Sequence, residues 1–301
     1  MRPRVIALPG NDALAGSIAT RVGGELGGAT VRPFPDGESY VRIDDRVEDR
    51  DVVLVCTLDR PNEKAVPLRL LAATARDLGA RHVGLVAPYL AYMRQDRRFA
   101  PGEGLTSSYF ARLLSETVDW LVTVDPHLHR HPSLEMLYAI PARTLHAAPV
   151  VAAWLRAHVP DATLIGPDAE SVQWVTAIGE LAGVPSRVLE KVRRGPRDVT
   201  VSLPTGVPLH GRTPVLIDDI VSTGSTMIAA IGELRRAGDA APVCVAVHAV
   251  FAGDAAERLA AAGAARVVTC NTIPHPSNGI DVGKLVADGV AAVLESQPFA
   301  R

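Results

Sequence analysis

The sequence predicts an α/β fold with two tandem domains, each a mostly parallel sheet flanked by helices. Short apolar runs of strand length alternate with segments of helical spacing along the chain, which is the pattern of βαβ units. The same order of strand, loop, helix and strand returns after roughly 150–160 residues, an interval far too long for a solenoid repeat. A length of 301 residues also suits about two domains.

The first elements are a strand, a helix and a hairpin. A strand over Val5–Leu8 is followed by an alanine-rich helical pattern that ends near Val22. The stretch Thr30–Phe34 is extended, and the residues of Glu38–Ile43 alternate as in a strand. Between them, Pro35-Asp-Gly37 is a turn sequence, so this region predicts a hairpin.

The rest of the first half alternates buried strands with amphipathic helices. Polar residues follow the strand ends, at the sheet edge where α/β proteins bind their ligands. In chain order we expect a strand over Asp51–Thr57, a helix over Pro67–Leu78, a strand over His82–Ala87, a helix over Ser107–Ser115 and a strand over Leu121–Val124.

The second half repeats this plan. The strand Val215–Ile217, a loop and the helix Met227–Ala237 repeat the order that begins at Asp51. We expect the domain boundary near His146–Pro149, before a helix over Val150–Ala157. The predicted domains are therefore residues 1–147 and residues 148–301.

Charge and composition argue against several classes of partner. A net charge of −2 provides no basic surface for nucleic acid, and no apolar run of about 18 residues is present to cross a membrane. The first residues lead directly into a strand pattern rather than a signal peptide. The cysteines, Cys56, Cys244 and Cys270, are isolated, which favours core residues in a reducing compartment. We therefore expect a cytoplasmic protein that binds neither nucleic acid nor a membrane.

The most informative stretch follows the strand Val215–Ile217. Asp218 and Asp219 end the strand, and Ser222-Thr-Gly-Ser-Thr226 forms a hydroxyl-rich loop at the start of a helix. Backbone N–H groups, hydroxyls and the helix dipole together suit an anion. Two carboxylates beside such a loop suit a sugar phosphate. A helix capped by Ser222, beside two acids at the solvent edge, would also explain the pattern.

Arg94-Gln-Asp96, here called the R-Q-D segment, follows the strand His82–Ala87 and opens a run of charged residues. Such runs are usually solvated surface. Their place at the carboxyl edge of a parallel sheet makes a ligand site an equal alternative, in which Arg94 clamps phosphate and Gln95 reads an adenine edge. Because the sequence contains no G-x-x-x-x-G-K-[ST], an ATP site here would not be a P-loop.

Histidines and an acid follow two other strand ends. His127, His129 and His131 alternate after Asp125, so they share a face and form either a metal cluster or a polar loop. His127 comes first after the strand and is the best single candidate as a metal or phosphate ligand. Asp168 stands at a strand-to-helix turn, either as a helix cap or as a contact for ribose or magnesium.

A basic stretch, Lys191-Val-Arg-Arg-Gly-Pro-Arg197, lies between two strand-like segments. Basic loops of this kind are usually surface decoration. As a flap, Lys191 and Arg193 would instead neutralise charge on a transferring phosphate group. The residues alone leave both interpretations open.

Taken in order, these motifs closely resemble those of the ribose-phosphate diphosphokinase (PRPP synthetase) family, whose domains have the type I phosphoribosyltransferase fold. The resemblance runs nearly the whole length and includes Phe34-Pro-Asp-Gly-Glu38 and Asn271-Thr-Ile-Pro274. It implies two phosphoribosyltransferase-like domains. The first, on the ATP side, has a degenerate phosphate loop at Thr57–Asn62, and the second keeps the loop for ribose 5-phosphate.

The resemblance implies transfer of the diphosphoryl group of ATP to the anomeric hydroxyl of ribose 5-phosphate, giving PRPP and AMP, with Mg²⁺ as cofactor. It also implies a homo-oligomer with active sites shared between subunits. The implied residues are Lys191, Arg193 and His127 for catalysis, His127 and Asp168 for the metal, Phe34, Asp36, Glu38, Arg94, Gln95 and Asp96 for ATP, and Asp218, Asp219, Ser222, Thr223, Gly224, Ser225 and Thr226 for ribose 5-phosphate.

Two rival functions stay open. A phosphoribosyltransferase would share the sugar-phosphate loop but use PRPP and a base, and the tandem first half with its R-Q-D segment argues against it. A non-catalytic relative that binds and regulates an active synthase is suggested by Glu170-Ser171, where the family commonly has two glycines. The histidine-rich segment after His127 also departs from the family pattern. The intact Lys191 and Arg193 argue for an active enzyme.

Overall fold

The chain forms two compact units. The computed structural model describes residues 1–128, 130–167, 171–193, 199–202 and 211–296, with the backbone alone for residues 190–193 and 199–202. The first unit comprises Met1–Leu145 together with the segment from Gly283 onward, and the second comprises His146–Val282. The chain therefore passes from the first unit to the second and back again.

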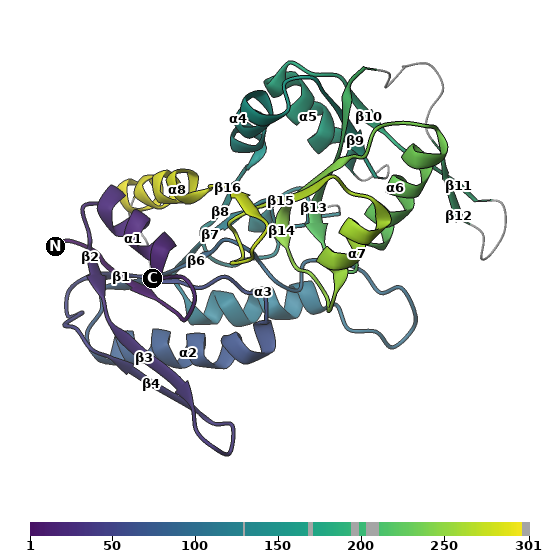
Figure 1. Cartoon of the computed structure of the whole chain (residues 1–301). Coiled ribbons are helices and arrows are strands. Elements are labelled where there is room, and N and C mark those ends of the chain that lie inside the picture. The colour runs from purple at the N-terminus through teal and green to yellow at the C-terminus, as the bar shows by residue number, and fades with distance from the viewer. Residues whose placement is uncertain (129, 168–170, 194–198, 203–210, 297–301) are drawn as a thin grey trace. The chain divides into compact units, whose positions relative to one another are not determined.

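The described residues of the first unit form a six-stranded parallel sheet. The pairs α1 with α8 and α2 with α3 are in contact, and the pairs cover opposite faces of the sheet (Figure 1). The strands, in spatial order, are β2 (Glu25–Gly27), β1 (Arg4–Ala7), β5 (Asp51–Val55), β6 (His82–Ala87), β7 (Trp120–Val124) and β8 (Ala142–Leu145). The helices are α1 (Asp12–Arg21), α2 (Pro61–Asp77), α3 (Thr106–Thr117) and α8 (Gly283–Glu295), and a short 3₁₀ turn, η1, spans Leu134–Met136.

Helix α8 is the main difference from the expected division into residues 1–147 and 148–301. It packs on α1, where Arg21 forms an ion pair with Asp288. Gly289 of α8 lies so close to Leu145 that a Cβ at position 289 would be 2.7 Å from the leucine side chain. The apolar face of α8 is thus buried in the first unit, a long-range contact that local periodicity does not reveal.

Helix α2 begins earlier than expected. The sequence predicted an amphipathic helix over Pro67–Leu78. The structure instead places Pro61 at the start, and Pro67 is buried inside the helix. Burial of Pro67 with Leu68 and Leu71 against the unit offsets the hydrogen bond that an internal proline removes.

The second unit has the same architecture. Its described residues form a six-stranded parallel sheet in the order β10 (Ser186–Val188), β9 (Ala162–Gly166), β13 (Thr213–Val221), β14 (Val243–Ala249), β15 (Arg266–Cys270) and β16 (Asn278–Ile280). Its helices are α4 (Ala148–His158), α5 (Val172–Ala182), α6 (Ser225–Arg236) and α7 (Ala255–Ala262). Helices α4 and α5 pack together, as do α6 and α7. The predicted α/β class with parallel sheets is confirmed.

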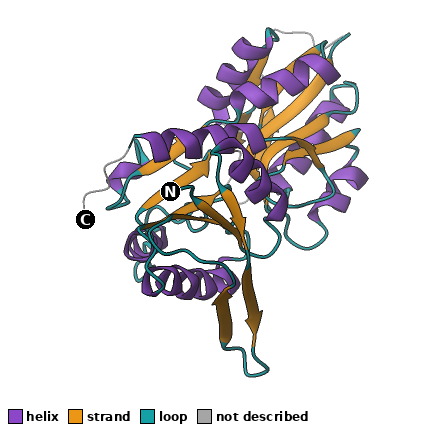
Figure 2. Cartoon of the chain, turned by 90° about the vertical axis from the view of Figure 1, so that its left-hand side faces the viewer, coloured by secondary structure: helices purple, strands orange, loops and turns teal. Residues whose placement is uncertain are grey.

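Each unit also carries an antiparallel hairpin. In the first unit, β3 (Ala29–Pro33) pairs with β4 (Ser39–Ile43), as the turn sequence predicted. This hairpin contacts α2 and extends away from the six-stranded sheet (Figure 2). In the second unit, β11 (Glu190–Arg193) pairs with β12 (Val199–Ser202). Across the described residues, no helix combines the length and apolarity needed to span a bilayer.

A substitution at Gly84 in β6 would test how tightly the first sheet is packed. A Cβ at this position would lie 1.9 Å from Trp120 Cε2 on the neighbouring strand, and Trp120 is buried. Gly84→Ala should therefore lower the free energy of unfolding by at least about 1–3 kcal/mol, the usual cost of overpacking a core. Urea denaturation measures this change.

Gly16→Ala is the matched control. Gly16 lies in α1, and a Cβ there would meet no atom within 4 Å. Because alanine favours a helix over glycine by about 0.5–1 kcal/mol, this variant should be neutral or more stable. Equal stability of the two variants would contradict the packing described for Gly84.

Candidate active site

The acidic pair of the second unit lies within β13 rather than beyond it. The sequence predicted that this strand ends at Ile217, but its last residues up to Val221 still pair with β14. Asp218 and Asp219 are half-buried in the carboxyl-terminal part of the strand. Asp218 Oδ1 accepts a hydrogen bond from the Asp219 N–H at 3.1 Å, and Asp219 Oδ1 accepts one from the Ile220 N–H at 2.7 Å. These bonds orient both carboxylates.

The loop Ser222–Thr226, here called the sugar loop, leads from β13 into α6. Helix α6 begins at Ser225, two residues before the predicted start at Met227. Gly224 immediately precedes it with φ +70°, a left-handed conformation that favours glycine. A Cβ at Gly224 would lie 3.4 Å from Leu259 of α7. The left-handed backbone is the reason that glycine is needed at this position, since a Cβ there would make only an ordinary van der Waals contact with Leu259.

The hydroxyls of the sugar loop face the surface. Thr223 and Ser225 are exposed, and their Oγ1 and Oγ atoms are 3.0 Å apart. Ser222 does not occupy the cap position, which belongs to Gly224, so the simple helix-cap explanation of Ser222 is wrong. The Ser222 carbonyl instead accepts a hydrogen bond from the Ala252 N–H at 3.1 Å. Hydroxyls beside the first N–H groups of a helix are the arrangement that binds a phosphate.

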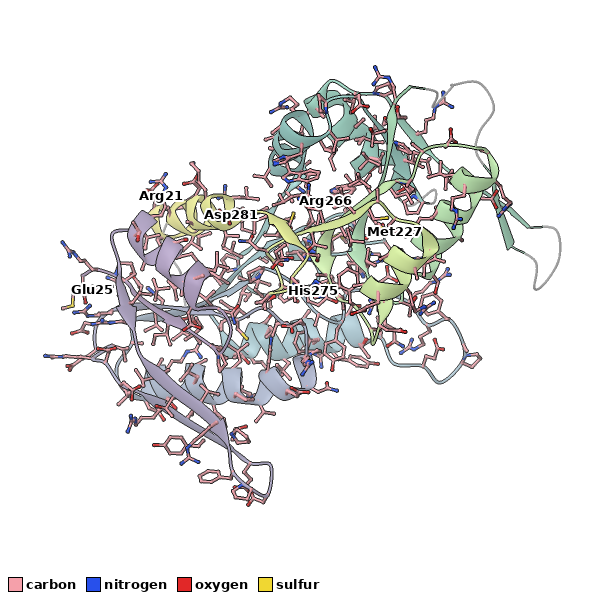
Figure 3. All side chains as sticks on the ribbon, in the orientation of Figure 1. Arg21, Glu25, Met227, Arg266, His275 and Asp281 are labelled. Atoms are coloured by element: carbon pink, nitrogen blue, oxygen red, sulfur yellow. The ribbon has the colours of Figure 1, made fainter. Side chains whose placement is uncertain are left out.

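The Asn271-Thr-Ile-Pro274 turn follows β15 and is held by hydrogen bonds that are exposed or half-buried at Asn271 and buried at Thr272. Asn271 Nδ2 donates to Asp281 Oδ1 at 2.7 Å, and Asn271 Oδ1 accepts from the Val282 N–H at 2.8 Å (Figure 3 labels Asp281). Thr272 Oγ1 lies 2.9 Å from His248 Nδ1 at the end of β14 and donates to a carbonyl of that strand. The turn is thus fixed to the carboxyl ends of its neighbours.

The R-Q-D segment of the first unit follows β6 and has only one fully exposed member. Arg94 is exposed. Gln95 Oε1 accepts a hydrogen bond from Thr106 Oγ1 at 3.0 Å, at the start of α3. The carboxylate of Asp96 is buried, and its two oxygens accept hydrogen bonds from Arg130 Nη1 at 2.9 and 3.1 Å.

Two residues in the segments that follow β6 and β7 have left-handed backbones. Tyr92 has φ +63° and Asp125 has φ +32°, values that are uncommon for residues other than glycine. The Asp125 N–H donates to the Leu145 carbonyl at 2.9 Å, which helps to hold this conformation. His127, two residues later, is half-buried. Backbone strain of this kind gathers at functional sites, where the surrounding structure maintains it.

The loop of the β3–β4 hairpin carries the other residues expected to bind ATP. The Phe34 N–H donates to the Glu38 carbonyl at 2.7 Å, and the Asp36 carboxylate accepts from the Glu38 N–H at 3.1 Å. The Arg32 guanidinium stacks over Phe34 and Tyr40, 5.1 and 4.5 Å from the ring centroids. Phe34 is nevertheless exposed, so a well-ordered loop presents an aromatic ring and two acids on the surface.

The remaining predicted residues are placed only in part. Lys191 and Arg193 lie on β11, where their backbones align with Val201 and Val199 of β12. Asp168, the expected metal ligand, and His129 lie outside the described residues. Among the residues that are described, no three His, Cys, Asp or Glu side chains gather closely enough to hold a metal ion.

The three cysteines are buried and none forms a disulfide, as the sequence predicted for core residues. Burial raises the pKa of Cys56 and of Cys244 to about 12 in each case. Both thiols are therefore protonated at neutral pH and unsuited to act as nucleophiles.

Two family matches cover most of the chain. Residues 4–117 match the N-terminal domain of ribose phosphate pyrophosphokinase, and residues 133–285 match the phosphoribosyl transferase domain. The ribose-phosphate pyrophosphokinase of Methanopyrus kandleri is 34% identical over 95% of this chain and 98% of its own length. That of Methanothermobacter thermautotrophicus is 31% identical over 94% and 98%. The chain belongs to the ribose-phosphate pyrophosphokinase family.

A solved structure of the same family has the same fold. The crystal structure of phosphoribosylpyrophosphate synthetase from Mycobacterium smegmatis aligns with a TM-score of 0.84 at 25% identity, covering 99% of this chain and 100% of that one. Both units of the present chain are therefore phosphoribosyltransferase-like domains, as the motifs had implied.

Sequence reasoning missed several residues that shape the site of this pyrophosphokinase family member. Arg130 was not singled out, although it stands three residues after His127 and proves to be the partner of Asp96. His248 and Tyr92 were not singled out either. Each of these three residues is recognised by its contact with a distant segment of the chain, and a local sequence pattern does not predict such a contact.

Proposed function

We propose that this chain transfers the diphosphoryl group of ATP to ribose 5-phosphate, giving PRPP and AMP. The observation that carries the proposal is the arrangement at the end of β13, where two oriented carboxylates precede a hydroxyl-rich loop at a helix start. The activity in the names of its full-length relatives agrees with this arrangement.

The sugar site follows from these contacts. A phosphate on the sugar loop would receive hydrogen bonds from Thr223, Ser225 and the first N–H groups of α6. The carboxylates of Asp218 and Asp219 would then accept hydrogen bonds from ribose hydroxyls. A ligand with a phosphate at one end and neighbouring hydroxyls further along satisfies both groups.

The reaction needs no protein nucleophile. The anomeric oxygen of ribose 5-phosphate attacks the β-phosphorus of ATP and forms a new O–P bond. The bond between that phosphorus and the oxygen bridging to the α-phosphate breaks, AMP leaves with the electron pair, and the hydroxyl proton is released. The protein therefore contributes positioning and charge stabilisation. We assign Lys191 and Arg193 to the transferring group.

Mg²⁺ is the proposed cofactor, and it would neutralise phosphate charge and orient the phosphate oxygens when bound. Mg²⁺ is usually held by one or two protein groups together with substrate phosphates and water. His127 is the first proposed ligand, and its imidazole is half-buried just after β7. Asp168 is the second proposed ligand, on the basis of the sequence motif alone.

Arg94 and Gln95 are proposed to bind the ATP phosphates and the adenine edge, and Phe34, Asp36 and Glu38 to reach the ATP of a second copy of the chain. The ordered, exposed loop of the β3–β4 hairpin, separate from the six-stranded sheet, supports this shared site.

Mixing two inactive variants tests the shared site. Arg94→Ala and Glu38→Ala should each be nearly inactive alone, and hybrids of the two should recover part of the activity because some sites contain neither change. Activity of the refolded mixture, with hybrid formation followed by two different tags, measures this. Hybrids that form without any recovery would contradict a shared site.

The surroundings of Ser171 are relevant to the alternative that this chain is a non-catalytic relative of the enzyme. The Glu170-Ser171 pair replaces two glycines common in the family, but Ser171 is buried. Its Oγ would lie 2.2 Å from a Cβ at Gly166, so the glycine at the end of β9 makes room for the serine side chain. The structure thus accommodates Ser171 inside the second unit.

Release of AMP tests the proposal against both rivals. AMP should appear only when ATP and ribose 5-phosphate are both present. A phosphoribosyltransferase would require PRPP and a base, and a non-catalytic relative would release no AMP under any combination.

We also propose the cytoplasm as the compartment, because Cys56, Cys244 and Cys270 are buried and none of them forms a disulfide.

A further inference from the structure

The ion pair between Asp96 and Arg130 joins two strand ends of the first unit. Asp96 belongs to the R-Q-D segment after β6, whereas Arg130 belongs to the segment after β7 that contains His127. Arg130 Nη1 lies 2.9 Å from one carboxylate oxygen of Asp96 and 3.1 Å from the other. The side chain of Asp96 is 1% exposed and that of Arg130 is 38% exposed.

These exposures show which way each group points. A carboxylate that is almost completely buried has lost its water and depends on its protein partner. Arg130 supplies that partner from the solvent side. The Asp96 carboxylate is therefore directed into the unit, and each of its oxygens accepts a hydrogen bond from Arg130.

The rest of the R-Q-D segment is anchored on both sides of Arg94. Gln95 is bonded to Thr106 at the start of α3. Tyr92, with its left-handed backbone, donates its hydroxyl proton to Asn62 near the start of α2 and packs its ring 4.6 Å from that of Phe110. Arg94 is the exposed residue between these anchors.

We infer that Asp96 and Arg130 form a positioning pair for the nucleotide rather than a contact with it. The pair fixes the backbone that presents Arg94, and it ties this segment to the one that carries His127. This inference rests on the proposed function, because it assigns the R-Q-D segment to ATP. It changes the role expected for Asp96, from a ligand of ATP to an internal anchor.

Binding of ADP, measured by titration calorimetry on the full chain, tests the pair without turnover. Arg130→Gln and Asp96→Asn should each raise the Kd for ADP by about tenfold or more, the scale seen when groups that orient ligand-binding side chains are lost. The double variant should bind no more weakly than the weaker single variant, because both changes remove one interaction. Arg69→Gln is the control, since Arg69 forms an exposed pair with Glu116 on the surface of the same unit.

Three outcomes would overturn the inference. The first is that Arg130→Gln binds ADP as tightly as wild type. The second is that the losses of binding free energy in the two single variants add up in the double variant, as expected if Asp96 contacts the nucleotide itself. If Arg130→Gln does not fold, Arg130→Lys takes its place, because lysine keeps the positive charge beside the buried Asp96 carboxylate. Its affinity should fall below that of wild type, and equal affinity is the third contradictory outcome.

Kinetics separate positioning from mere stability. Loss of the pair should raise the KM for ATP while leaving the KM for ribose 5-phosphate within a few-fold, whereas loss of a purely structural contact would lower kcat and leave both KM values unchanged. If the wild-type chain itself binds no adenine nucleotide, the proposed function fails and takes this inference with it. If wild type binds and the variants bind equally, only the positioning pair fails.

Discussion

Replacing Lys191 with alanine is expected to lower kcat by at least ~10²–10³ while the KM for ribose 5-phosphate stays within a few-fold. The transferring diphosphoryl group redistributes its negative charge in the transition state, and a preorganised cation there contributes about 2.7–4 kcal/mol. Lys191 lies on β11, and its backbone aligns with that of Val201 on β12. Steady-state kinetics at saturating Mg²⁺ measures the effect.

Arg193→Lys should also reduce kcat, because an ammonium group cannot reproduce the two parallel contacts of a guanidinium. Lys284→Ala is the matched control, since Lys284 is exposed on α8 and pairs with Asp288. If Lys191→Ala turned over as fast as this control, the catalytic role of Lys191 would be contradicted, and the basic stretch would be an ordinary surface segment.

Asp219→Asn is expected to raise the KM for ribose 5-phosphate by about 10- to 100-fold with little change in the KM for ATP. Hydrogen bonds to a charged group contribute about 1.5–3 kcal/mol, and asparagine keeps the shape of the side chain while losing the charge. Its remaining carbonyl can still accept from the Ile220 N–H, so β13 should keep its local geometry. Thr226→Ala should shift the same KM in the same direction.

Asp239→Asn is a suitable control for this series, because Asp239 lies just beyond α6 in the same unit and outside the sugar loop. Initial rates with each substrate varied in turn measure both KM values. Equal changes in the two KM values for Asp219→Asn would remove Asp219 from the sugar site.

Local patterns predicted the sugar loop and the β3–β4 hairpin well, because each is a short contiguous signal. Pro35-Asp-Gly37 specifies a turn, and small residues after a buried strand specify a strand-to-helix loop. The length of β13 was underestimated, since two aspartates are unusual inside a strand. Their pairing with β14 depends on a neighbouring strand and could not be read locally.

Contacts between distant segments account for the other differences. The short edge strands β2 and β16 have only three residues each, too few to show a period. Helix α8 looks like any amphipathic helix, and its place on α1 follows from burial in the folded chain. The Asp96–Arg130 pair likewise joins residues 34 positions apart, so the sequence suggested an ATP contact where the structure shows an internal bond.

The most direct measurement of the central claim follows the β-phosphorus of ATP. The chain is incubated with ribose 5-phosphate and ATP that carries ³²P in the β-position, and the products are separated. Diphosphoryl transfer predicts that the label appears in PRPP and that AMP is released unlabelled. Label recovered in ADP, with a single phosphoryl group transferred to the sugar, would contradict the account.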